Sequence, residues 1–489
     1  MGRNEKRGKS GKVTRSSRRD PKLQNLIDEA KALSARQRDD DAYRLMMTKF
    51  ETYGHYPAWQ ERMGFICLNL HRTEEAEFYL LRALAKEPDA SSLHSYLGYL
   101  YFETAEYQKS IEHHKRAMEL SETEWPYYVN FSYVAENMGL YEQAMTALVV
   151  ASRIQKNEPQ ILFRLGEISL CFGRIEEGWK LYEAGFGCNK RFAPIPRNYK
   201  YWEDEDPSDK TILVWREQGI GDEIRNACLY DDLLACAGQT IIECEPRLAS
   251  IMERSFPEAR IVPQADPPKD TVHPPFDHHT GQFSLHRRFR KTVEDYHRNA
   301  RPEGFLKPDP EKVAYWRQRL ESLGGDSIVG ISWTSGLRFT QRKHHFFRPV
   351  EMDNILTQPG VTFVNLFYGD AEEDLREAEE RFGITIHRWP DVDLKNDLET
   401  TFAMTAALDL LISAPTSSAD IGGAVGTETW TFAPRRAITR LGTDHYPHSP
   451  CIRAYNRQLN EPWGPVLQRV AKDFEGWLAE RRGPARKRA

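Results

Sequence analysis

Three neighbouring hydroxyl side chains stand at Thr416, Ser417 and Ser418, where an apolar run ends and a helical pattern begins. The apolar run 408–413 is typical of a buried strand, and the helix is expected from about residue 418 to 425. Hydroxyls and free backbone N–H groups at a helix N-terminus suit a phosphate group. Ordinary capping of the helix by Thr416 or Ser417 would explain the same residues. The sequence leaves both interpretations open.

A second candidate site is the turn Gln218-Gly219-Ile220-Gly221-Asp222, which follows the apolar run 211–215. Gly219 and Gly221 would let the backbone approach a substrate closely, because neither carries a Cβ atom. Asp222 would stand at the N-terminus of the next helix, where a carboxylate can cap free N–H groups. This turn is therefore a candidate substrate contact, with Asp222 as its one ionisable group.

A third candidate is a basic segment that contains Arg338, Arg342, Lys343 and Arg348. Cations in such a segment could offset the charge on a departing phosphate. A solvated run of charges would look the same in the sequence, so both alternatives remain.

Several other kinds of chemistry are disfavoured. Ile224 occupies the third glycine position of a dinucleotide fingerprint, which argues against a plain dehydrogenase. The seven cysteines are odd in number and lack zinc-ligand spacing, as expected of reduced residues. The histidine-rich stretch 273–286 has no helical i, i+4 pair and is expected to form a loop near the cleft. The acidic run 203–206 is expected to be a solvated turn, so neither a metal ion nor another cofactor is predicted.

The elements that would position these candidates alternate between strand and helix. Apolar runs at 211–215, 240–244 and 259–262 form one set, and runs at 327–333, 361–366, 384–387, 408–413 and 427–432 form another. Strand, glycine-rich turn, helix and strand in this order open a doubly wound parallel sheet. The sequence therefore predicts two α/β halves, at 211–308 and 309–462, that face each other across a cleft.

Before this part, small residues recur at a fixed spacing. The first column of small residues has one member every 34 residues: Gly64, Gly98, Ser132 and Gly166. Two further columns have the same spacing: Ala76, Ser110, Ala144 and Gly178, and Ala83, Ala117, Ala151 and Gly185. This period is the tetratricopeptide pattern, in which small side chains let paired helices approach. Ala30 and Ala42 extend it into a degenerate first hairpin over 21–56. Such arrays bind a polypeptide on their concave face.

The whole chain is expected to be a soluble, cytoplasmic, multidomain protein. Its net charge of −5 and pI near 6.3 indicate neither nucleic acid nor an anionic membrane as partner. No signal peptide and no membrane span are recognisable. The predicted order is a disordered basic tail (1–20), repeats (21–187), an ordered aromatic linker (188–210), the two α/β halves, a helix (463–481) and a second basic tail (482–489).

The segment Leu213–Asp222 resembles the start of a GT-B glycosyltransferase domain of the ADP-heptose heptosyltransferase type. Four further stretches agree, namely 329–333, 397–401 with 406–413, 423–426 with Trp430, and 441–447. From about residue 50 to 480 the chain is similar to bacterial proteins that fuse tetratricopeptide repeats to such a domain. The resemblance implies two Rossmann-like halves and inverting, metal-independent transfer from a nucleotide sugar. It also implies that Asp222 is the general base, and it favours Arg348 among the cations of the basic segment.

The chain departs from this family at one place. The family has Asp-Thr-x-x-x-His after the strand 408–413, and here Pro415 and Asp420 stand at the Asp and His positions. The change favours either a different donor or a degenerate site. Together the features predict transfer of a sugar from a nucleotide sugar to a Ser or Thr hydroxyl of a protein held by the repeats. Such fusions could serve a flagellin-like acceptor, although no residue here selects one. A non-catalytic adaptor and a saccharide or lipid-saccharide transferase are the alternatives.

Overall fold

A computed structural model describes residues 20–192, 199–335 and 346–482 of the chain. The chain divides into two compact units, Met1–Glu122 and Thr123–Ala489. The two predicted basic tails lie largely outside the described residues. In the part of the chain that the structure describes, no helix combines the length and apolar character that a membrane crossing requires.

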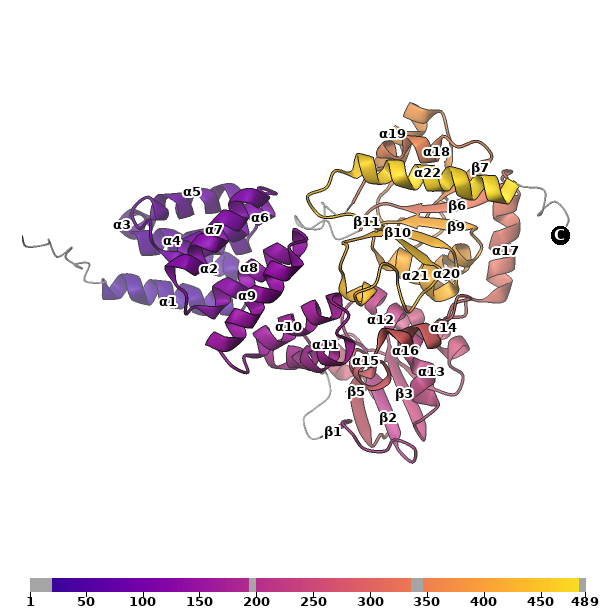
Figure 1. Cartoon of the computed structure of the whole chain (residues 1–489), viewed down its shortest axis with the longest axis horizontal. Helices are drawn as coiled ribbons and strands as arrows, with labels where there is room; N and C mark the ends of the chain where they lie inside the picture. Colours follow the sequence, from indigo (N-terminus) through magenta and orange to yellow (C-terminus); the bar gives the residue numbers. More distant parts are fainter. Residues whose placement is uncertain (1–19, 193–198, 336–345, 483–489) are drawn as a thin grey trace, which may run out of the picture. The chain divides into compact units, whose positions relative to one another are not determined.

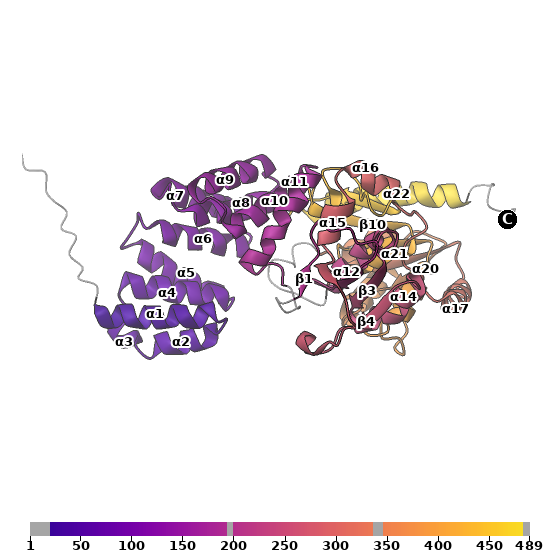
Figure 2. The ribbon, with the colours of Figure 1, turned by 90° about the horizontal axis from the view of Figure 1, so that it is seen from below.

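The first unit consists of paired helices, which lie side by side in Figures 1 and 2. They are α1 (Pro21–Ala35), α2 (Asp39–Met47), α3 (Phe50–Tyr53), α4 (Pro57–Asn69), α5 (Thr73–Leu84), α6 (Ser91–Glu103) and α7 (Tyr107–Leu120). The predicted first hairpin is present as α1 and α2, with Ala30 and Ala42 fully buried between its helices and their neighbours.

The second unit begins with two more hairpins, α8 (Trp125–Asn137) with α9 (Tyr141–Ile154), and α10 (Pro159–Cys171) with α11 (Ile175–Tyr182). The helices α4, α6, α8 and α10 begin 34 residues apart, and so do their partners α5, α7, α9 and α11. The tetratricopeptide-like repeat predicted from the spacing of small residues is therefore confirmed.

The small residues are needed because the helices of each hairpin touch at these positions. A Cβ atom on Gly64 would lie 2.6 Å from Leu80 Cγ, and one on Gly166 would lie 2.7 Å from the backbone nitrogen of Tyr182. Both distances are far below ordinary van der Waals contact. The period in the sequence thus follows from the close approach of helices within each hairpin.

The last two hairpins belong to the same compact unit as the α/β part, so the division does not fall at the predicted boundary after residue 187. The reason is a set of buried polar contacts. Arg191 forms ion pairs with Glu217 and Glu183, each at 2.7 Å. Trp179 of α11 donates a hydrogen bond to the hydroxyl of Tyr296 at 2.9 Å. These contacts join α11 and the segment after it to the first sheet and its helices.

The first sheet has the strand order β1-β5-β2-β3-β4, and all its pairs are parallel. Its strands are β1 (Lys200–Tyr201), β2 (Thr211–Trp215), β3 (Gln239–Cys244), β4 (Arg260–Pro263) and β5 (His278–Gly281), and its helices include α12 (Ile220–Asn226), α13 (Tyr230–Leu234), α14 (Ala249–Ser255), α15 (Ser284–Phe289) and α16 (Val293–Arg298). The expected loop over 273–286 is wrong in part, because β5 is a buried strand between β1 and β2. Its histidines carry no apolar pattern that could have revealed it.

The second sheet has the order β11-β10-β9-β6-β7-β8 and is also parallel throughout. Its strands are β6 (Ser327–Ser332), β7 (Val361–Asn365), β8 (Ile386–His387), β9 (Leu410–Ser413), β10 (Thr429–Ala433) and β11 (Ile452–Asn456). Its helices are α17 (Pro310–Glu321), α18 (Asp353–Leu356), α19 (Glu372–Phe382), α20 (Leu398–Ala406), α21 (Ser417–Val425) and α22 (Trp463–Arg482). Two parallel sheets after a helical repeat region agree with the predicted α/β class.

Candidate functional site

The turn between β2 and α12 carries the predicted residues in a constrained backbone. Gln218 has a φ of 59°, which a residue with a side chain rarely adopts, and Gly219 is the N-cap of α12. The carboxylate of Asp222 accepts a hydrogen bond from the Gly219 N–H at 3.4 Å. Gln218 Nε2 donates to the carbonyl of Lys190 at 2.9 Å, which ties the turn to the segment that follows α11. Asp222 is thus a capping residue that is still one-third exposed.

Arg225 connects Asp222 to Asp420, which lies on α21 in the other α/β half. Its guanidinium donates to Asp222 Oδ1 at 3.0 Å and to Asp420 Oδ1 at 3.3 Å. Burial, and secondarily the charge of Asp222, raise the pKa of Asp420 to about 6, although Arg225 acts in the opposite direction. The sequence singled out both carboxylates separately, and the fold brings them to one arginine.

Gly221 is needed for contact within the protein. A Cβ atom at this position would lie 2.5 Å from Asp420 Oδ2 and 3.4 Å from Ser417 Cα. The predicted close approach therefore occurs between α12 and α21. A Cβ atom at Gly219 would meet only Asp222, at 3.7 Å.

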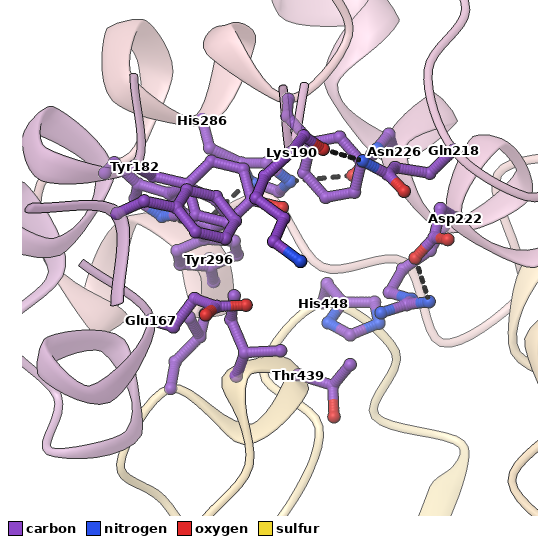
Figure 3. A pocket seen from close by; sticks show the side chains of 16 residues that line it. Glu167, Tyr182, Lys190, Gln218, Asp222, Asn226, His286, Tyr296, Thr439 and His448 are labelled. Carbon is purple, nitrogen blue, oxygen red and sulfur yellow. Dashed lines mark hydrogen bonds and ion pairs between the residues drawn. The ribbon is translucent and has the colours of Figure 1, made fainter. Parts of the chain in front are cut away.

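A cavity of about 270 Å³ opens beside Asp222 and is called here the repeat-side cavity. Figure 3 shows Glu167 and Tyr182, from the repeat helices, across the space from Gln218 and Asp222. The other lining residues come from α10, α11 and the segment after it, α12, α15 and the residue before it, α16 and the segment 438–448: Phe163, Trp179, Lys190, Arg225, Asn226, Phe283, His286, Tyr296, Ile438, Thr439, Leu441 and His448. The last repeat hairpin and both α/β halves therefore share one cavity.

A buried chain of hydrogen bonds holds one wall of this cavity (Figure 3). Trp179 donates to the Tyr296 hydroxyl, Tyr296 donates to His286 Nδ1 at 2.9 Å, and His286 Nε2 donates to Asn226 at 2.9 Å. Trp179 also stacks on His286 with ring centroids 4.3 Å apart. Burial and nearby arginines hold the pKa of His286 well below its usual range, so the imidazole is neutral. Burial likewise lowers the pKa of His448 to about 3.

A larger cavity of about 670 Å³ lies at the carboxyl ends of β7 and β9 and is called here the sheet-end cavity. Ile220 and Arg247 line it from the first half, and Ser417 and Ser418 of α21 line it from the second. The other lining residues also belong to the second half: Leu366, Phe367, Tyr368, Gly369, Asp370, Glu373, Asp374, Leu394, Lys395, Leu398, Thr401 and Ile421. Ligands of parallel α/β sheets bind at this edge, where helix N-termini converge.

The segment Pro415–Asp420 supplies the N-terminus of α21 to this cavity. Thr416 is the N-cap, but its side chain makes no capping hydrogen bond, and its Oγ1 is buried without a partner among the described residues. The Ser418 hydroxyl hydrogen-bonds Ser332 at the end of β6, at 3.2 Å. Pro415 is exposed. The sequence allowed two interpretations of these hydroxyls, and the geometry contradicts one of them, capping of α21 by the Thr416 side chain.

The predicted basic segment reaches the described part of the chain only at Arg348. Arg338, Arg342 and Lys343 lie outside the described residues. Arg348 pairs with Asp374 at 3.0 Å and with Glu377, so its charge is already matched by α19. Asp374 also accepts a hydrogen bond from Trp333 at 3.0 Å and lines the sheet-end cavity. Arg348 is thus linked to the cavity through Asp374.

Several lining residues were not identified from the sequence. Arg225 looks like an ordinary exposed helix residue, and Glu167 looks like a polar position of a repeat. The cations of the sheet-end cavity belong to no recognisable motif: Arg247 lies in a 3₁₀ helix (Pro246–Leu248), and Lys395 lies in the loop before α20. One signal in the sequence points to this wall, because the stretch 441–447, which resembles the family, continues into His448. The rest depended on contacts between distant segments.

No family model matches the chain. It is 32% identical over 432 residues to Protein FlbA of Caulobacter vibrioides, a match that covers 84% of this chain and 71% of that protein. Among solved structures, it is similar to a thermophilic TPR protein of Thermus thermophilus, with 20% identity, a TM-score of 0.31, and coverage of 34% of this chain and 90% of that one. PilF of Pseudomonas aeruginosa matches with 14% identity, a TM-score of 0.31, and coverage of 34% and 76%.

Proposed function

The chain belongs to the family of Protein FlbA of Caulobacter vibrioides, and we propose that it is an inverting glycosyltransferase with a protein acceptor. In this proposal a sugar passes from a nucleotide-sugar donor to a Ser or Thr hydroxyl of a polypeptide bound by the repeats. One observation carries the proposal. The first turn of α12 stands between two cavities, with Ile220 lining the sheet-end cavity and Asp222 lining the repeat-side cavity.

The sheet-end cavity is the proposed donor site, in a GT-B arrangement of the two halves. Its volume of about 670 Å³ is within the range of small-molecule sites. Ser417, Ser418 and the N-terminus of α21 suit the phosphate groups, and Lys395 adds positive charge, whereas Arg247 is paired with Glu245 at 2.8 Å. Asp370 and Glu373 would accept hydrogen bonds from sugar or ribose hydroxyls. The donor is a co-substrate, and the proposed reaction uses no metal ion.

The repeat-side cavity is the proposed acceptor site. Two of its walls come from α10 and α11, and tetratricopeptide-type repeats commonly bind polypeptides. A segment held by these helices would reach Asp222 without leaving the repeats. The aromatic residues Phe163, Tyr182 and Phe283 would pack against its apolar side chains.

Asp222 is the proposed general base. The acceptor hydroxyl oxygen attacks the anomeric carbon, its proton passes to the Asp222 carboxylate, and the bond from that carbon to the phosphate oxygen breaks. Attack opposite the leaving phosphate inverts the anomeric configuration. The N-terminal N–H groups of α21 would stabilise the charge that develops on the phosphate.

The test is transfer of label from radiolabelled nucleotide sugars to proteins of a cell lysate. We expect a labelled protein with the wild type and a loss of about 10²- to 10⁴-fold with Asp222→Asn. The control is Asp295→Asn, because Asp295 caps α16 through the backbone N–H of Thr292 at 2.9 Å but lines neither cavity of the described structure. Asp295→Asn should keep full activity.

Titration calorimetry with nucleoside mono- and diphosphates separates this proposal from a non-catalytic adaptor. An enzyme should bind its product nucleotide in the wild type and in Asp222→Asn alike. Absence of both nucleotide binding and labelling would refute the transferase proposal and favour the adaptor. Labelling of a saccharide or lipid fraction, with no labelled protein, would refute the protein acceptor.

A further inference from the structure

A single arginine connects carboxylates from the two α/β halves at the proposed reaction centre. Arg225 lies between Asp222, at 3.0 Å, and Asp420, at 3.3 Å. The side chains of Arg225 and Asp420 are each 19% exposed, whereas Asp222 is 35% exposed. Of the two carboxylates that Arg225 joins, Asp222 lines the repeat-side cavity together with Arg225, whereas Asp420 lies behind them.

The contact is close because Gly221 leaves room for it. A Cβ atom there would lie 2.5 Å from Asp420 Oδ2, so this carboxylate is seated against the backbone of the turn that carries Asp222. Asp420 lines neither the repeat-side nor the sheet-end cavity in the described structure. It can therefore influence a substrate only through its neighbours.

Stability does not explain why a carboxylate occupies this position. Burial raises the pKa of Asp420 to about 6, so in the folded protein the ionised form is disfavoured relative to the unfolded chain. The charged and titratable groups that face Asp420 are Asp222 and Arg225 from α12 and Tyr446 from the loop before β11, and His448 lies beside Arg225. Only Arg225 favours its ionisation. Ionisable side chains whose pKa is strongly shifted by burial are characteristic of functional sites.

We propose that Asp420 is a positioning residue, which holds Arg225 and through it fixes the carboxylate of Asp222 at the boundary between the two cavities. The inference rests on the proposed function, in which Asp222 takes a proton from the acceptor. Asp420 thereby links α21, whose N-terminus faces the donor, to the turn that faces the acceptor. This link stands where the resembling family has an imidazole.

The test compares Asp420→Asn with the wild type in the sugar-transfer assay. We expect kcat to fall about 10- to 100-fold with less than a threefold change in KM for the donor. In the wild type, activity should fall as the pH drops below about 6, because protonation of Asp420 releases Arg225. The part of this fall that is centred near pH 6 should disappear in Asp420→Asn. The unfolding midpoint at pH 7.5 should stay the same or rise, whereas a merely structural role predicts that it falls.

Gly221→Ala provides a second variant, because its methyl group displaces the Asp420 carboxylate without removing it. It should reproduce both the fall in kcat and the loss of the pH dependence centred near pH 6. Full activity of Asp420→Asn with an unchanged pH profile would overturn the proposal. A second result would also overturn it, namely that Asp420→Asn lowers both kcat and the unfolding midpoint while Gly221→Ala keeps the wild-type kcat.

A readout without transfer separates this inference from the proposed function. Hydrogen exchange, followed by mass spectrometry on the full chain, should speed up at residues 219–226 in Asp420→Asn. If the wild type transfers no sugar but this local change is seen, the transferase proposal fails and the structural link stands. Unchanged exchange at these residues would overturn the link itself.

Discussion

Arg191→Met should destabilise the unit Thr123–Ala489 strongly, because Arg191 is a buried cation between carboxylates. Its side chain is fully buried, and that of Glu217 is 2% exposed. The guanidinium donates from Nε and Nη2 to the two oxygens of Glu217, both at 2.7 Å, and from Nη1 to Glu183 at 2.7 Å. Removing one partner of a buried pair leaves an uncompensated charge, which costs about 3–5 kcal/mol.

The effect can be measured by urea unfolding of the full chain, followed by tryptophan fluorescence. All of the eleven tryptophans except Trp59 lie in this unit, so the signal reports mainly on it. The control is Arg301→Met, because the Arg301–Asp231 pair has a similar distance of 2.6 Å but is 44% and 39% exposed. Such a surface pair contributes at most about 1 kcal/mol.

A double variant checks the mechanism. Glu217→Gln removes the carboxylate that Arg191→Met leaves without its cation, so the double variant should be less destabilised than Arg191→Met alone. The reasoning is refuted if Arg191→Met loses no more than Arg301→Met, or if the double variant recovers nothing. Glu217 also directly precedes Gln218 in the turn before α12, so Arg191→Met should reduce sugar transfer as well.

Two further predictions concern packing and pH. Gly166→Ala should destabilise the last hairpin by about 1–3 kcal/mol, because its Cβ atom would lie 2.7 Å from the backbone nitrogen of Tyr182. The control is Gly476→Ala, which should be neutral or stabilising, because a Cβ atom there would have no other atom within 4 Å. Equal urea midpoints for the two variants would contradict the packing argument. Burial raises the pKa of Glu223 from its ordinary 4.5 to about 7, so the free energy of unfolding should fall as the pH rises from 4.5 to 7. Glu223→Gln should flatten this fall in urea titrations across the same range, and an unchanged slope would exclude Glu223 as its source.

The helical hairpins could be predicted in detail because their constraint is local in sequence. The glycines of the first column make room for a residue of the same hairpin, Gly64 for Leu80, Gly98 for His114 and Gly166 for Tyr182, and these contacts recur with the repeat. The parallel sheets were predicted in outline for a similar reason, since buried strands such as 211–215 and 408–413 are continuous apolar runs. Strand β5 was not predicted, because its residues His278 and His279 are buried although they are not apolar.

The candidate site was predictable only as separate pieces. Asp222, the hydroxyls at 416–418 and the unusual Asp420 each stood out by residue type and position. Their relation did not, because Arg225 and Asp420 are 195 residues apart and meet only when the two halves fold together. The contribution of Glu167 and Tyr182 to the repeat-side cavity likewise depends on how α10 and α11 pack against the first α/β half.

The amino-acid pattern alone therefore determined the repeat period, the α/β class and the turn that holds Asp222, because short-range sterics and burial leave direct traces in neighbouring residues. Tertiary structure decided which wall of the cavity the repeats supply and which carboxylates Arg225 joins. It also decided that Gly221 makes room for Asp420 on α21 rather than for a substrate. Such contacts arise from the packing of elements distant in sequence, and no spacing along the chain encodes them.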